Sequence, residues 1–100
     1  MLVLAGRLAH ASSRTLDEQI SRLLGTGNAR LVIDFAAVDY VSSGGLEVVG
    51  RAAAAAAAAG GTLVISGLSD SVRMVFELSG MLPAVATEES REAAIERARR

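Results

Sequence analysis

The sequence contains no cysteine, and all ten of its cationic side chains are Arg, because it contains no lysine either. Without cysteine the chain forms no disulfide and has no thiolate chemistry. Without lysine it lacks the residue that a P-loop places against a nucleotide phosphate. The formal net charge of −1 leaves no basic footprint of the kind that nucleic-acid-binding proteins present to phosphates.

Aromatic residues and long apolar runs are also scarce. Three aromatic side chains, Phe35, Tyr40 and Phe76, are too few for a base-stacking or sugar-binding surface. No apolar run reaches the roughly 20 residues of a membrane span, and no basic segment precedes an apolar one at Met1. We expect a single cytoplasmic domain over residues 1–100 that binds neither membrane nor nucleic acid.

Apolar runs and helix signals alternate along the chain, which predicts an α/β fold. Strands are expected over residues 1–5, 30–35 and 62–66, with a short edge strand at 84–86. Helices are expected from Thr15, over about 45–59, from Ser69 or Asp70 to Gly80, and after Thr87. This order predicts a sandwich with a mainly parallel sheet of about four strands and with four helices.

The starts of two helices are predicted from particular residues. Thr15 and Glu18 have the spacing of a capping box, in which each side chain satisfies a free N–H group of the first turn. Thr87 is expected to cap the last helix, with two glutamates in its first turn. That helix carries little apolar surface besides Ile95 and alanines, so we expect it to dock weakly.

No set of residues indicates a catalyst. His10 is the only histidine, and its neighbours include no fixed acidic partner. Neither Ser42 nor Ser43 follows a glycine at the spacing of a nucleophile elbow. Asp34 and Asp39 cannot be paired into an acid–base or metal site from their spacing alone. We therefore expect no enzyme activity, no metal and no cofactor.

The turn Ser42-Ser43-Gly44-Gly45 lies between an expected buried strand and an expected helix. Hydroxyl oxygens at such a place accept hydrogen bonds from free backbone N–H groups, and the helix dipole favours an anion there. Open α/β sheets also place ligand contacts at the carboxyl ends of parallel strands. This turn is the candidate functional site, and a nucleotide-binding module that uses it as an anion site is one alternative.

The stretch Val38-Asp39-Tyr40-Val41-Ser42-Ser43-Gly44-Gly45-Leu46 resembles the signature loop of STAS domains. This family includes anti-sigma-factor antagonists and the cytoplasmic tails of sulfate transporters. Further stretches resemble other elements of the family: Gly6-Arg7-Leu8, the strand led by Gly60-Gly61, and the helix of residues 72–80 with Phe76 and Gly80. The resemblance covers nearly the whole chain.

The sequence departs from the family pattern at three places. Ser42 stands where phosphorylated antagonists usually have Asp, and Ala9 stands where the family has Asp after its early glycine element. The family's first strand, which usually precedes the position of Met1, is missing. An uncovered sheet edge favours self-pairing, so a homodimer is one expected assembly.

The resemblance implies an anti-sigma-factor antagonist. Such proteins bind a serine-kinase anti-sigma factor, are released when the kinase phosphorylates a loop serine, and are restored by a phosphatase. The matching serine here is Ser43. A competing interpretation is a non-phosphorylated STAS scaffold subunit of a transport complex or a stressosome-like complex.

The residues expected to contact a partner lie in the turn and on the helix that follows it: Ser42, Ser43, Gly44, Gly45, Glu47 and Arg51. Glu47 and Arg51 are four positions apart, so they are also expected to face each other on that helix. Met74 and Phe76 are expected in the core rather than at a contact surface.

Overall fold

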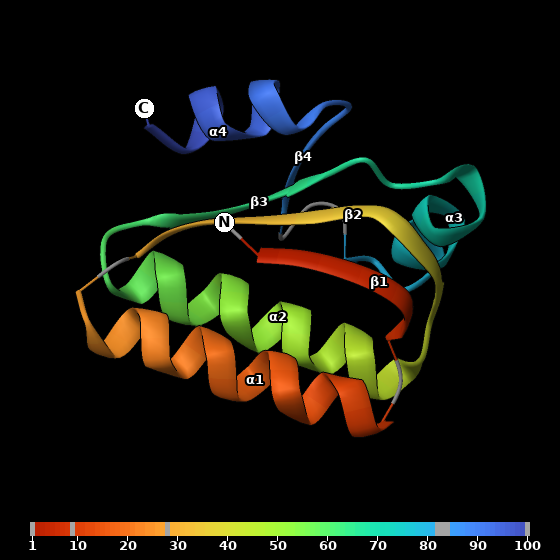
Figure 1. Ribbon diagram of the computed structural model, residues 1–100, viewed down its shortest axis with the longest axis horizontal. Coiled ribbons are helices and arrows are strands. Elements are labelled where there is room, and N and C mark those ends of the chain that lie inside the picture. Colours follow the sequence, from red (N-terminus) through yellow and green to blue (C-terminus); the bar gives the residue numbers. More distant parts are fainter. Residues whose placement is uncertain (1, 9, 28, 82–84, 100) are drawn as a thin grey trace.

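A computed structural model describes residues 2–8, 10–27, 29–81 and 85–99. The strands are β1 Leu2–Leu8, β2 Arg30–Val41, β3 Thr62–Ser66 and β4 Ala86–Glu88. The helices are α1 His10–Gly25, α2 Ser43–Ala58, α3 Asp70–Leu78 and α4 Arg91–Arg99. Within the described residues the strands form one parallel sheet in the order β1-β2-β3-β4. The predicted α/β sandwich of four strands and four helices is confirmed (Figure 1).

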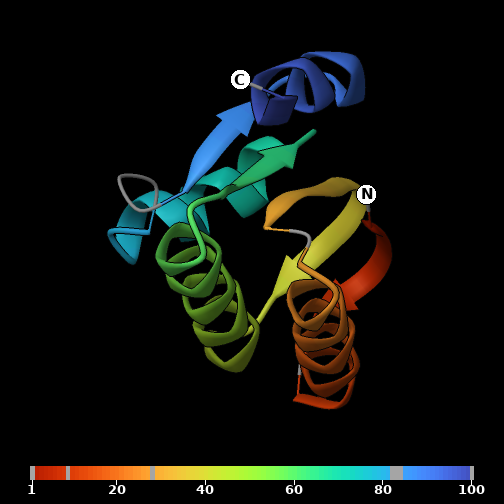
Figure 2. The ribbon, with the colours of Figure 1, turned by 90° about the vertical axis from the view of Figure 1, so that its left-hand side faces the viewer.

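The two faces of the sheet are covered unequally. Helices α1 and α2 lie side by side on one face, and α4 lies on the other (Figure 2). Alternate residues of β2 and β3, such as Ile33 and Ile65, belong to the large core that also holds the buried side chains of α1, α2 and α3. The residues between them, Val32 and Val64, pack instead with two alanines of α4. The main core is therefore on the α1–α2–α3 side.

Strand β2 extends well beyond the predicted segment 30–35 and pairs with β1 as far as Val41. Its register with β1 shifts twice, once beyond Asp34 and once before Tyr40. At each shift β2 has one residue more than β1, which is the geometry of a β-bulge. The strand predicted over 30–35 therefore ends six residues too early.

The two bulges also explain why these residues do not read as a strand. After Ile33 the buried apolar positions of β2 are Phe35, Val38 and Val41. Each bulge inserts one residue between two buried positions, so a spacing of three replaces the usual alternation. A search for period-two alternation therefore stops at Phe35.

Two predicted helix starts differ from the structure. Helix α1 begins at His10, so exposed Thr15 lies inside it and the predicted capping box is wrong. Strand β1 also continues past the predicted segment 1–5 to Leu8, through its pairing with β2. At the other end, Thr87 pairs with Ile65 in β4 and does not cap α4. The cap is Ser90, whose Oγ accepts a hydrogen bond from the backbone N–H of Ala93 at 3.1 Å.

Of the two residues of α3 that were expected in the core, only Phe76 is buried. Val72 on the same helix and Leu16 and Ile20 of α1 are buried too. Met74 is 59% exposed, so its placement in the core is wrong. It lies midway between the two buried residues of α3 and therefore on the opposite side of the helix. The predicted edge strand 84–86 falls partly outside the described residues.

Candidate functional site

The two serines of the turn occupy different positions in the structure. Ser42 is the N-cap of α2, with extended backbone, and its Oγ accepts a hydrogen bond from Gly45 N at 3.1 Å. Its carbonyl oxygen accepts from Leu46 N at 2.9 Å and so begins the helix. Ser43 is the first residue of α2, and it is exposed. The predicted cap at this turn is therefore Ser42, while Ser43 lies open to solvent.

Backbone contacts fix the turn against the end of β1. The N–H of Ser42 donates to the carbonyl oxygen of Leu8 at 2.8 Å. A Cβ on Gly45 would lie 2.8 Å from that same oxygen and 2.9 Å from Leu8 Cγ. Only glycine fits there, as expected for a close backbone approach. Gly44 is less restricted, because a Cβ at that residue would meet Ser42 Oγ at an ordinary 3.7 Å.

The two charged residues predicted for the site differ in their surroundings: Arg51 is paired with a residue of α1, and Glu47 is exposed. Glu47 is exposed on α2, one helical turn beyond Ser43. Arg51 lies 3.6 Å from a carboxylate oxygen of Asp17 on α1, so its ion pair links the two helices. The expected pairing of Arg51 with Glu47 is therefore wrong. Both partners of the observed pair are about half exposed, and such pairs contribute about 0–1 kcal/mol.

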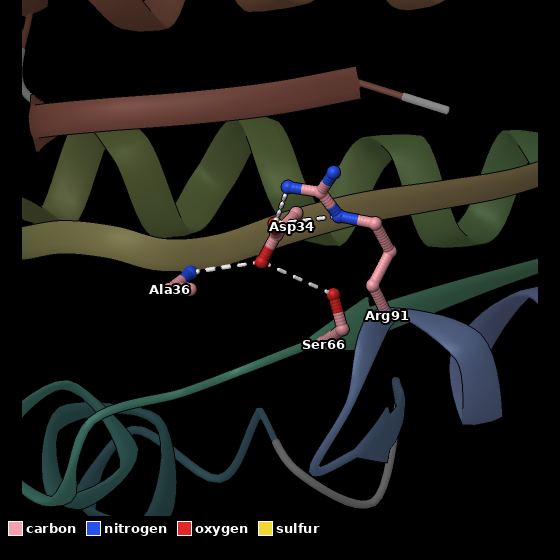
Figure 3. A network of polar contacts seen from close by, with 4 residues as sticks. All are labelled: Asp34, Ala36, Ser66 and Arg91. Carbon is pink, nitrogen blue, oxygen red and sulfur yellow. Dashed lines mark hydrogen bonds and ion pairs between the residues drawn. The ribbon is translucent and has the colours of Figure 1, made fainter.

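A second polar cluster, which the sequence did not indicate, surrounds Asp34 on the α4 side of the sheet (Figure 3). Its Oδ1 accepts from Ala36 N at 3.0 Å and from Ser66 Oγ at 3.3 Å. Its Oδ2 accepts from both Nε and Nη2 of Arg91, the first residue of α4. Asp34 itself is only 4% exposed. A carboxylate inside an apolar strand is the signal that could have found this cluster, because buried Asp is nearly always paired.

These contacts also set the charge state of the buried carboxyl. The N–H of Ala36, followed by the guanidinium of Arg91, holds the pKa of Asp34 below its ordinary value. The two oxygens of the carboxylate accept four hydrogen bonds from the protein, which offset the cost of burying its charge. Among the described residues, no cluster of three or more His, Cys, Asp or Glu side chains is arranged to hold a metal ion. No helix of the described chain is long and apolar enough to cross a membrane.

Comparison with known proteins supports one family. A family model described as "Mlab, STAS domain" matches residues 1–82. A curated relative from Bordetella bronchiseptica, BtrV, is classed as an anti-sigma factor antagonist. It is 37% identical over 91 residues, which are 91% of this chain and 78% of the relative.

Solved structures show the same fold. A protein from Thermotoga maritima, also classed as an anti-sigma factor antagonist, superposes with a TM-score of 0.89 at 18% identity, over 98% of this chain and 86% of that one. The Bacillus protein SpoIIAA in its phosphorylated form superposes with a TM-score of 0.73 at 25% identity, over 95% of this chain and 86% of its own. Because the sequence matches over most of its length and the fold over nearly all of it, the chain belongs to the STAS domain family and is of the anti-sigma-factor antagonist type.

Proposed function

We propose that this chain is a protein-binding switch that binds a serine-kinase anti-sigma factor and is released when that kinase phosphorylates Ser43. The observation that carries the proposal is the division of roles in the turn. Ser42 forms the cap of α2, while the Ser43 side chain is exposed on the first residue of the helix. The hydroxyl of Ser43 can therefore be modified without removing the cap.

The physical effect of the modification is local. A phosphoryl group adds about −1.5 to −2 charges at neutral pH. The positive end of the α2 dipole lies beside Ser43 and offsets part of that charge, so the fold tolerates it. Glu47, exposed one turn further along α2, adds negative charge to the same surface. A partner surface that had accepted a neutral hydroxyl would then meet an uncompensated charge and a desolvation cost.

The contact surface in this proposal is the turn with the first turns of α2: Ser42, Ser43, Gly44, Gly45, Glu47 and Arg51. A phosphatase would return the chain to its binding form. The chain would act in the cytoplasm as one domain, residues 1–100, without a cofactor and without an enzymatic activity of its own. The name of BtrV, an anti-sigma factor antagonist, and the phosphorylated form in which SpoIIAA was solved support this assignment. A homodimer through the β1 edge of the sheet stays a prediction.

Incubation with a serine-kinase anti-sigma factor and ATP tests the proposal. We expect a mass gain of about 80 Da, one phosphoryl group, that maps to Ser43. Ser42→Ala should still be phosphorylated, whereas Ser43→Ala should bind the kinase and not be released from it. Ser43→Asp should not bind, and its melting temperature should stay near that of the parent protein. A mass gain that maps to another residue, or a Ser43→Asp variant that unfolds, contradicts the proposal.

The second candidate is a STAS scaffold subunit that is not phosphorylated. The observation that favours it is the description of the matching family model, which names Mlab rather than an antagonist. In this case the kinase reaction would give no mass gain, and the chain would co-purify with the ATPase of a transport complex. The two candidates therefore predict opposite results in the same pair of experiments.

A further inference from the structure

Strand β2 stops pairing with β3 at Asp34 and from there on pairs only with β1. The pair formed by Asp34 and Ser66 is the last pair between β2 and β3. Beyond it β2 continues beside β1 to Val41 and then enters the turn of residues 42–45, called here the serine turn. The geometry at Asp34 therefore decides in which direction the strand approaches the candidate site.

The side chain of Asp34 satisfies the backbone at this point. The first register shift of β2 follows Asp34 directly, and the N–H of Ala36 lies within that bulge. Oδ1 of Asp34 accepts this N–H at 3.0 Å, a local side-chain bond of the kind that replaces a strand-to-strand bond. The bulge is thus held by the carboxylate two residues before it.

Helix α4 lies on the same face of the sheet as this carboxylate and contacts it directly. Arg91 donates to Oδ2 from Nε at 3.1 Å and from Nη2, while Ser66 Oγ donates to Oδ1 (Figure 3). The apolar contact of α4 with β2 and β3 is small, since its buried side chains are Ala94 and Ala98. The polar link at Arg91 therefore adds to a small apolar contact, as do the bond from Arg30 Nη1 to the carbonyl oxygen of Arg99 and the contacts of Arg97 with β4.

The bulge is also enclosed by the residue that follows β3. Gly67 has a φ of +72°, and a Cβ there would lie 3.1 to 3.2 Å from the Cβ, Cα and N atoms of Ala36. The N–H of Gly67 donates to the carbonyl oxygen of Glu88 at the end of β4. The position of Ala36 is therefore set by Asp34 and by Gly67, and both residues are connected to the β4–α4 segment.

We propose that Arg91 is a positioning residue for the serine turn. By fixing the carboxylate of Asp34 it holds the first bulge of β2, and that bulge sets how the strand presents Ser42 and Ser43. Loss of the Arg91 contact would therefore loosen the serine turn, although α4 and α2 lie on opposite faces of the sheet. The structural part of the claim stands without the proposed function; its consequence for phosphorylation rests on that function.

Amide hydrogen exchange of the free protein tests the structural part. The variant is Arg91→Gln. The matched control is Arg97→Gln, because Arg97 is the other ion-paired arginine of α4 and its side chain has the same exposure of 46%. Arg91→Gln should speed the exchange of the Ala36 and Gly45 amides about tenfold or more, since a hydrogen bond to a charged group is lost. Arg97→Gln should leave both amides unchanged.

Other outcomes overturn the proposal. Faster exchange confined to the amides of α4 would mean that Arg91 fixes only its own helix. Equal effects of the two variants would mean that any lost charge on α4 loosens the chain. If Arg91→Gln does not fold, Arg91→Lys keeps the charge but lacks the paired Nε and Nη2 donors, and its exchange pattern decides between the same outcomes. Because no kinase is present, this test can fail or succeed independently of Ser43 phosphorylation.

Discussion

The Oγ of Ser42 accepts a hydrogen bond from the backbone N–H of Gly45 at 3.1 Å, so Ser42 is the residue of the serine turn that caps α2. It leaves the neighbouring hydroxyl of Ser43 exposed on the first residue of α2. A helix that was capped by Ser43 could not have that hydroxyl modified without losing its cap. The arrangement instead keeps the structural hydroxyl and the candidate switch hydroxyl on adjacent residues.

The first prediction separates these two hydroxyls by stability. Ser42→Ala should lower the free energy of unfolding by about 1 kcal/mol, the usual loss for an N-cap. Ser43→Ala should change it by no more than about 0.5 kcal/mol, as for other exposed substitutions. Urea denaturation of both variants measures the difference. A larger loss of stability for Ser43→Ala than for Ser42→Ala would show that Ser43, and not Ser42, caps the helix.

The second prediction concerns the close approach of the turn to β1. In Gly45→Ala the new methyl group would lie 2.8 Å from the carbonyl oxygen of Leu8, so α2 must shift away from the strand. We expect a loss of about 1–3 kcal/mol, as for other overpacked sites. Gly44→Ala is the matched control on the same helical turn, and its methyl group has an ordinary contact. The melting temperature of Gly44→Ala should be higher than that of Gly45→Ala. Equal melting temperatures would show that the close approach of Gly45 to Leu8 does not affect stability.

Most elements could be predicted because they follow ordinary periodic patterns. The helix of Leu16 and Ile20, the strand 62–66 and the glycine at the end of α2 all follow local rules. The start of α1 could not be predicted, because the residues before Leu16 have no apolar spacing and Thr15 offers a false cap. The second half of β2 was missed because two bulges remove the alternation that marks a strand.

The site was predictable to the extent that it is local. Strand, turn and helix are consecutive, so the position of Ser42 and Ser43 followed from the sequence. The contact of Arg91 with Asp34 joins residues 57 positions apart, and no periodicity links them. Arg51 likewise had two acidic neighbours within reach, and only the packing of α1 on α2 selects Asp17 over Glu47. Contacts between elements require the fold itself.

The third prediction is a pH dependence that originates at Asp34. The Ala36 N–H and the Arg91 guanidinium lower its pKa in the folded chain, below the unfolded value of about 3.9. A depressed carboxyl pKa contributes stability that is fully present above the unfolded pKa and is lost as pH falls through the folded pKa. The free energy of unfolding of the parent protein should therefore decline below about pH 5, and Asp34→Asn should decline less.

Urea denaturation over an acidic pH series measures this difference. Asp39→Asn removes a carboxylate from an exposed position on the same strand and controls for the lost charge. At neutral pH Asp34→Asn should already be less stable than the parent by about 1–3 kcal/mol, because Arg91 loses its charged acceptor. Parallel pH profiles for Asp34→Asn and the parent would show that Asp34 does not contribute to the acid sensitivity.

The fourth prediction concerns the contact that holds α3 beneath β2. The rings of Phe35 and Phe76 are packed edge to face, with centroids 5.9 Å apart and planes at 84°, and both side chains are fully buried. Phe76→Ala should cost about 3–5 kcal/mol, because it removes both a buried ring and its edge-to-face contact with Phe35. Met74→Ala on the same helix changes a residue that is 59% exposed and should cost less than about 0.5 kcal/mol.

Since small domains have a total stability of about 5–15 kcal/mol, Phe76→Ala should remain folded only marginally at room temperature. Denaturant midpoints of the two variants test this, and similar midpoints would mean that α3 does not depend on its aromatic contact with β2.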